Sequence, residues 1–102
     1  MYTVTYTHTR PNVLIKFFVD ANEETKALVA RVVDAAQRSP GYVGLSSTMS
    51  PDGLTNTVVV TWADESFWQA HEIADLELLD EYRSARIAYN AVVGNTTETT
   101  NA

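Results

Sequence analysis

Residues 58 to 72 of this chain read VVVTWADESFWQAHE, and within them the pattern changes from strand to helix. The first part is rich in β-branched residues up to Trp62, which is typical of a strand. Asp64 then stands where a helix N-cap is expected, and His71 follows within the helical pattern. The stretch therefore predicts a strand over Thr55–Ala63 that leads directly into an amphipathic helix.

Two further strands are predicted before this junction. Pro51-Asp52-Gly53 has the composition of a tight turn, so Tyr42–Ser50 and Thr55–Ala63 are expected to form a hairpin. Residues 2 to 9 alternate strictly, as a half-buried strand does. One face of that strand carries Tyr2, Val4, Tyr6 and His8, and the other carries Thr3, Thr5, Thr7 and Thr9.

An amphipathic helix of about 16 residues is predicted between the first two strands. Asp20 to Glu23 has capping-box spacing, and Ser39-Pro40-Gly41 ends the helical pattern. Residues 13 to 19 are apolar but too short for a helix, and an extended lead-in segment is favoured over a further strand. The apolar face of the helix carries Leu28, Val29, Val32, Val33 and Ala36.

The C-terminal part is predicted to be helical as far as Gly94. A break is expected near Ala74-Asp75, and a second helical register then runs from Leu78 to Val92. Residues 86 to 93 also fit a strand by composition, but their spacing favours a helix. Residues 1 to 94 then form one domain, and residues 95 to 102 (NTTETTNA) are predicted to be a disordered polar tail.

Composition excludes several functional classes. The net charge of −6 argues against binding to a nucleic-acid backbone, and the absence of cysteine excludes thiolate chemistry. No signal peptide or membrane-spanning run is visible, so we expect a cytoplasmic protein. We expect no metal and no organic cofactor, because the acidic run from Asp75 to Glu81 has no histidine at ligand spacing.

Three features in this order resemble the dimeric α+β-barrel superfamily, in particular its antibiotic-biosynthesis-monooxygenase-like group. They are Pro40-Gly41-Tyr42, the hairpin turn at Pro51-Asp52-Gly53, and the strand ending in Trp62 before an acidic helix start. The resemblance covers roughly residues 2 to 75. It implies an α+β, ferredoxin-like fold of order β-α-β-β-α(-β), with an antiparallel sheet, helices on one face, and two chains packed as a barrel.

The resemblance also implies an activity, a cofactor-independent monooxygenase acting on an aromatic or polyketide-like molecule. In the haem-degrading branch of the superfamily, a helix histidine acts with a tryptophan and an asparagine of the first strand. His71 and Trp62 match the first two, but the first strand here has no asparagine, which argues against haem degradation. A homodimer is implied as well, since a sheet with helices on one face leaves its other face uncovered.

Six residues are candidates for the site. His8 and His71 are the only histidines and therefore the natural acid/base pair. Trp62 is a candidate pocket wall, although packing under a helix is the favoured explanation and the two roles are compatible. Tyr6, Tyr82 and Arg86 are candidate substrate-binding residues, because an arginine beside tyrosines can orient an anionic or phenolic group. For Tyr82 and Arg86 the favoured interpretation is that they cover a sheet edge or contact a partner chain.

Two other functions compete with the monooxygenase. One is a non-catalytic dimeric module that binds a ligand or assists a larger assembly. The other is a histidine-dependent cyclase or isomerase that uses His8 and His71. A closed cavity between sheet and helices, with Trp62 and both histidines facing it, would favour an enzyme.

Overall fold

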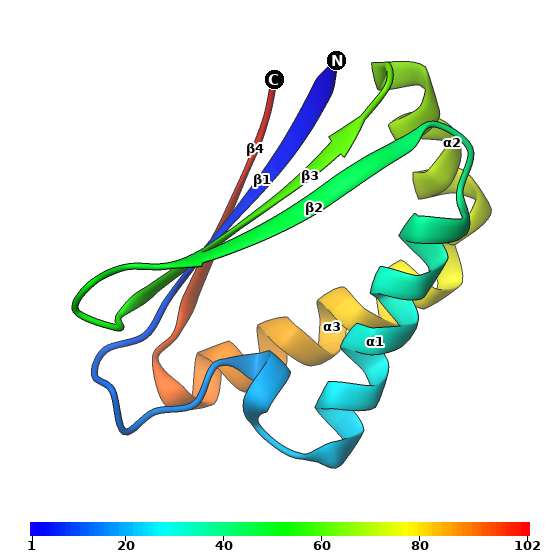
Figure 1. Ribbon diagram of the computed structural model, residues 1–102. Coiled ribbons are helices and arrows are strands. Elements are labelled where there is room, and N and C mark those ends of the chain that lie inside the picture. The colour runs from blue at the N-terminus through cyan, green and yellow to red at the C-terminus, as the bar shows by residue number, and fades with distance from the viewer.

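The computed structural model describes all residues from 1 to 102. It contains a four-stranded antiparallel sheet of order β2-β3-β1-β4, and all helices lie on one side of it (Figure 1). This is the predicted ferredoxin-like α+β fold. Its elements are β1 (Tyr2–Thr9), the 3₁₀ turn η1 (Phe18–Asp20), α1 (Glu23–Arg38), β2 (Tyr42–Met49), β3 (Thr55–Trp62), α2 (Glu65–Ala74), α3 (Leu76–Val93) and β4 (Thr96–Asn101).

The hairpin of β2 and β3 turns where the sequence predicts it. The Asp52 carboxylate accepts hydrogen bonds from the Leu54 N–H at 3.0 Å and from the Ser50 hydroxyl at 2.6 Å. Gly53 follows with a φ of +75°, which glycine adopts without steric cost. This turn sets the register from Met49↔Asn56 to Gly44↔Thr61, and an irregularity between Tyr42 and Gly44 then brings Tyr42 opposite Trp62. On the other side of β3, Trp62 lies opposite Tyr2 of β1.

The helix boundaries agree with the predictions except at the start of α1. Its N-cap is Asn22, whose side chain accepts from the Thr25 N–H, and the capping box is formed with Thr25 instead of running from Asp20 to Glu23. The side chain of Asp64 caps α2 as predicted. The helical conformation is interrupted at Asp75, between α2 and α3, as predicted. Helix α3 then continues through residues 86 to 93 and ends at Gly94, which has a left-handed backbone conformation.

Residues 13 to 19 form no strand, as predicted, but they are not an extended segment either. They run through turns into η1, which carries the buried rings of Phe17 and Phe18 under the sheet. The ring of Phe18 meets Tyr82 and Tyr89 of α3 edge-on at 5.9 and 5.8 Å. The lead-in segment thus packs against α3 on the helix side of the sheet.

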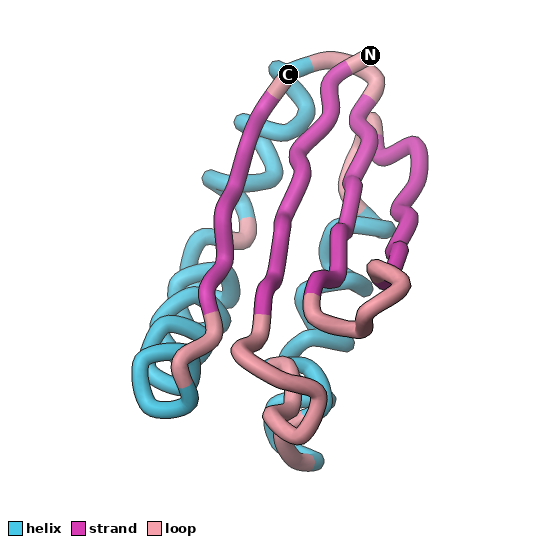
Figure 2. Tube along the Cα trace, turned by 90° about the vertical axis from the view of Figure 1, so that its left-hand side faces the viewer, coloured by secondary structure: helices cyan, strands magenta, loops and turns pink.

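The prediction that residues 95 to 102 are a disordered tail is wrong. Residues 96 to 101 form β4, an edge strand that pairs antiparallel with β1 from Thr9↔Thr96 to Val4↔Asn101 (Figure 2). Thr3 and Ala102 exchange two further backbone hydrogen bonds at 2.8 and 2.9 Å. The strand has no apolar face to reveal it in the sequence, but β1 offers it an unpaired edge, and threonine is a good strand former. The two chain ends therefore lie side by side (Figure 1).

The two faces of the sheet differ in composition. The face under the helices carries Val4, Val60 and Trp62, which form the core with Ala36 of α1. The other face has no helix over it and is covered mainly by threonine; we call it the open face. It consists of Thr3, Thr5, Thr7 and Thr9 of β1, Thr55, Thr57, Val59 and Thr61 of β3, Ser46 and Thr48 of β2, and Thr96, Glu98 and Thr100 of β4. Only nine residues of the chain are buried, because the space between sheet and helices is not filled. None of the helices has the length and apolar character needed to cross a membrane.

Candidate functional site

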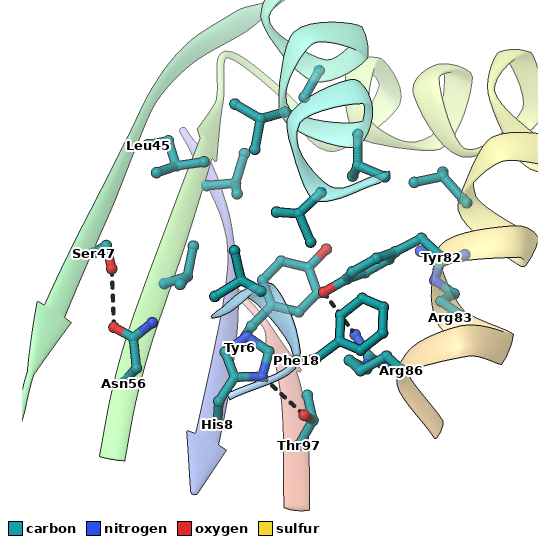
Figure 3. Close-up of a pocket in the computed structure, with 18 of the residues that line it drawn as sticks. Tyr6, His8, Phe18, Leu45, Ser47, Asn56, Tyr82, Arg83, Arg86 and Thr97 are labelled. Atoms are coloured by element: carbon teal, nitrogen blue, oxygen red, sulfur yellow. Dashed lines mark hydrogen bonds between the residues drawn. The ribbon is translucent and has the colours of Figure 1, made fainter. Parts of the chain in front are cut away.

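A cavity of about 280 Å³ lies between the inner face of the sheet and the helices α1 and α3 (Figure 3). The valines of the predicted helix face, Val29, Val32 and Val33, line it from α1. Val58 and Val60 line it from β3. The residues that the sequence predicts as the apolar face of α1 thus enclose a space, and only Ala36 among them is buried.

All six candidate residues line this one cavity. Trp62 and His71 lie at the end where β3 leads into α2, and Tyr6 lies further along β1. His8 lies at the other end, near the start of β4, where it is opposite Thr97. Tyr82 and Arg86 face the strands from α3 (Figure 3). Their shared location is observed, whereas their roles remain predictions.

His71 is buried and held in one orientation. Its ring packs on Trp62 with the centroids 5.0 Å apart, and its Nδ1 lies 2.8 Å from the Asp75 carboxylate and 3.1 Å from the Ser39 hydroxyl. A carboxylate can only accept, so Nδ1 carries the proton. The other nitrogen, Nε2, is then the one able to accept a proton.

His8 has a different environment. Its Nδ1 lies 2.8 Å from the Thr97 hydroxyl of β4. Burial, together with the positive charge of Arg86, lowers the pKa of His8 from 6.5 to about 4. The ring is therefore neutral at pH 7, and it is a poor general base there.

His8 and His71, the candidate acid/base pair, do not meet in the cavity. His8 lies in register with Asn56, whereas Trp62, against which His71 packs, lies in register with Tyr2. Six residues along a strand separate these positions, which is roughly 20 Å at about 3.4 Å per residue. The two imidazoles face the same cavity from opposite ends and cannot exchange a proton directly.

Tyr6 lies between these ends, and it is a neutral phenol. Burial raises the pKa of Tyr6 above 10.0, and the negative charge of Glu72 adds to the shift. Glu72 itself receives two hydrogen bonds from the Arg83 guanidinium, at 2.7 and 2.9 Å. The phenol therefore offers a hydrogen-bond donor and is not a base.

Three lining residues of chemical interest were not predicted from the sequence. Asn56 of β3 shares the face of Val58 and Val60, and its Oδ1 accepts from the Ser47 hydroxyl at 2.9 Å. Trp68 of α2 has a buried indole N–H without a partner, and Asn95 has a buried carbonyl oxygen without one. Asn56 could have been singled out from the sequence, because asparagine is depleted in strands and here it interrupts an apolar strand face.

Comparison with known proteins identifies solved structures with a similar fold. No family model matches the sequence, and no curated protein matches it. Among solved structures, SnoaB of Streptomyces nogalater, described as a cofactor-independent oxygenase, is 18% identical with a TM-score of 0.66, covering 99% of this chain and 89% of SnoaB. The ActVA-Orf6 monooxygenase of Streptomyces coelicolor, solved with the ligand nanaomycin D, is 14% identical with a TM-score of 0.61, covering 99% of this chain and 84% of that one.

A third similar structure bears on assembly. It is a protein of an uncultured marine organism, described as a dimeric ferredoxin-like protein, with a TM-score of 0.61 and 14% identity. Identities this low establish a shared fold and leave activity open. The chain has the ferredoxin-like α+β fold found in the antibiotic-biosynthesis monooxygenases.

Proposed function

We propose that this protein is a cofactor-independent monooxygenase that oxidises an electron-rich aromatic molecule in the cavity under the sheet. The observation that carries the proposal is the cavity itself, an apolar space of about 280 Å³ with one oriented histidine, His71, in its wall. Similar structures described as oxygenases and monooxygenases support it.

His71 is the proposed general base. Asp75 fixes its tautomer, so Nε2 can remove a proton from an acidic C–H or O–H group of the substrate. The resulting carbanion can reduce O₂ directly and form a C–O bond. Loss of water from the hydroperoxide then converts a ring CH₂ into a carbonyl group, so that substrate and O₂ give ketone and H₂O.

The remaining wall has two roles. Trp62, which is 1% exposed, packs flat aromatic surface against the cavity and keeps water out. Tyr6 supplies a hydrogen-bond donor for the oxygen atom on which negative charge develops, and Arg86 orients an anionic or phenolic group of the substrate.

Oxygen uptake tests the proposal. With 1,8-dihydroxyanthrone as probe, we expect the protein to consume O₂ and form the anthraquinone without any added cofactor. His71→Ala should lower the rate about 10²- to 10⁴-fold, which is the usual contribution of a general base. Gln69→Ala, an exposed position on the same helix, is the matched control and should leave the rate unchanged.

Two results would contradict it. One is uptake no faster than the uncatalysed reaction, and the other is an equal rate in wild type and His71→Ala. Binding of the probe without oxygen uptake would identify a non-catalytic ligand-binding module instead.

We also propose that the protein is a homodimer joined through the open face of the sheet. That face has no helix over it, and Val59 stands near its centre between Thr5 and Ser46. A second copy of the chain would cover both open faces at once. The similar structure described as dimeric supports this arrangement.

A further inference from the structure

Two arginines of α3 differ in a way that points to a missing partner. Arg83 donates two hydrogen bonds to Glu72, so its charge is neutralised. Arg86, one turn later, forms no ion pair. Its Nε is buried without a hydrogen-bond partner. Its other contacts are one long hydrogen bond of 3.4 Å from Nη1 to the Tyr82 hydroxyl and the ring of Tyr82 beneath it.

The arginine guanidinium stays positively charged in proteins. A guanidinium facing an apolar cavity without a counter-charge is costly, and the cost is relieved when an anion binds. Glu72 is the only carboxylate that lines the cavity, and Arg83 already holds it. The positive charge of Arg86 is therefore available to a ligand.

The residues beside Arg86 also present donors. The Asn90 amide donates to the Thr97 hydroxyl at 3.2 Å, and the same hydroxyl, which keeps its own proton and a second lone pair, lies 2.8 Å from Nδ1 of His8. A neutral imidazole that accepts at Nδ1 carries its own proton on Nε2. With the Thr97 hydroxyl as donor in this bond, the remaining nitrogen of His8 is a donor, and this is the tautomer that an anion site requires.

Asn56 adds a further donor from the strand next to His8. Its carbonyl oxygen is occupied by the Ser47 hydroxyl, so its amide N–H groups are what it can offer to a ligand. His8 and Asn56 are register partners on β1 and β3, and Arg86 faces them from α3 (Figure 3).

We propose that Arg86, His8 and Asn56 form an anion-binding site, and that the ligand of this cavity is an aromatic compound carrying a carboxylate or a comparable oxyanion. The inference deepens the proposed function and rests on it for the oxidation step, while the binding preference stands independently. Thr97 is a positioning residue, since it acts on the ligand through His8. The anionic group lies at the β4 end of the cavity, and the aromatic body extends toward Trp62 and His71.

Paired probes test the charge preference. Naphthalene-2-carboxylate and naphthalene-2-carboxamide have nearly the same shape and differ in charge, and their binding can be followed by the quenching of Trp62 and Trp68 fluorescence in low-chloride buffer. We expect the carboxylate to bind the wild-type protein about tenfold or more tightly than the amide, as buried charge-assisted hydrogen bonds do. Equal affinities, or no binding of the carboxylate, would overturn the proposal without any variant being made.

Variants then locate the preference. Arg86→Met should reduce the ratio of the two affinities to about threefold or less, whereas Arg86→Lys, which keeps the charge, should retain part of it. Arg31→Gln is the matched control, since Arg31 pairs with Glu81 on the surface at 3.4 Å and should leave the ratio unchanged. A ratio that survives Arg86→Met contradicts the assignment.

The tautomer of His8 has its own spectroscopic signature. Correlation of the ring nitrogens with the ring protons by ¹⁵N NMR should show His8 as the Nε2–H form in the wild-type protein at pH 7. Thr97→Val should change it to a mixture, and Thr97→Ser should restore it. A wild-type Nδ1–H form would remove His8 from the site.

The outcomes separate this inference from the monooxygenase. The naphthalene probes have no ring CH₂ to oxidise, so the affinity ratio does not depend on turnover. A strong preference for the anion without oxygen uptake from the anthrone would refute the monooxygenase and keep the anion site. Oxygen uptake without a preference would do the reverse.

Discussion

At the scale of single residues, the two histidines show what burial and neighbours do to one side-chain type. His71 is held by a carboxylate that fixes its proton on Nδ1. His8 is held by a hydroxyl and lies close to the charge of Arg86, which disfavours its protonated form. One is therefore suited to accept a proton and the other to donate a hydrogen bond.

The lowered pKa of His8 predicts a dependence of stability on pH. Because the folded protein binds this proton with a pKa of about 4, whereas the unfolded chain binds it with a pKa near 6.5, unfolding takes up a proton between these values. The contribution of His8 to the free energy of unfolding should therefore be fully present above pH 6.5 and be lost as the pH decreases toward 4. His8→Gln should remove this part of the decrease.

Urea unfolding of wild type and His8→Gln at half-unit steps between pH 7 and 4 measures the effect. The difference between the two proteins is the relevant quantity, because carboxylates titrate in both. Two curves that stay parallel over the whole range would show that His8 is not perturbed.

Sequence periodicity predicted the shared face of the β1 candidates but not their distance from the other candidate residues. Alternation along β1 correctly grouped Tyr6 and His8 on one face, which is the inner one. The sequence did not predict that His71 is buried in the cavity wall, since a single histidine on a helix is more often at the surface. Alternation along a strand does not tell where on that strand a helix packs, so it cannot give the distance between a strand residue and a helix residue. For this reason His8 and His71 were grouped as a pair although the structure separates them.

At the scale of elements, the connection between α1 and β2 depends on one glycine. Gly41 has a φ of +80°, and a Cβ at this position would overlap the ring of Phe67 at the start of α2. The Gly41 carbonyl also accepts from the Ala63 N–H at 2.7 Å, which ties this turn to the end of β3. Both the backbone angle and the close approach of α2 require a residue without a side chain.

Gly41→Ala should therefore destabilise the protein by about 2–4 kcal/mol. Gly44→Ala is the matched control, since a Cβ on Gly44 meets nothing within 4 Å and its φ is not positive. That variant should change the free energy of unfolding by less than about 1 kcal/mol. Equal unfolding free energies of the two variants, measured in urea, would contradict the role of Gly41.

The element that sequence reasoning missed is also explained by the structure. Prediction of a strand relies on an apolar face, and the inward positions of β4 are Thr97, Thr99 and Asn101. The first contributes its hydroxyl to His8 and lies beside a cavity, so an apolar residue was not required there. The capping residue of α1 shifted from Asp20 to Asn22 for a local reason, since η1 already occupies residues 18 to 20.

At the scale of the whole molecule, the sheet has one face packed on helices and one face of threonines. A dimer through the open face predicts a mass in solution of twice the 11.3 kDa of one chain. Val59→Asp places a charge near the centre of that face and should give the monomer mass by light scattering. Ile73→Asp is the control, because Ile73 is 77% exposed on the helix side and should leave the dimer intact.

A monomer mass for the wild-type protein would refute the dimer. So would a Val59→Asp protein that remains dimeric. Circular dichroism of Val59→Asp distinguishes dissociation from unfolding.

The pairing of β1 with β4 has a consequence for the order of events during synthesis. The hydrogen bond between His8 and Thr97 joins residues 89 positions apart, and the partners of β1 on both sides come much later in the chain. At about 5–20 residues per second, a ribosome needs roughly 4–18 s to extend the chain from β1 to β4. Throughout that interval the first strand exposes a long alternating edge, and strands with unpaired edges are prone to pair with other chains. We therefore expect nascent chains truncated before residue 96 to aggregate, and the cavity to acquire its anion-binding end only when the last strand joins the sheet.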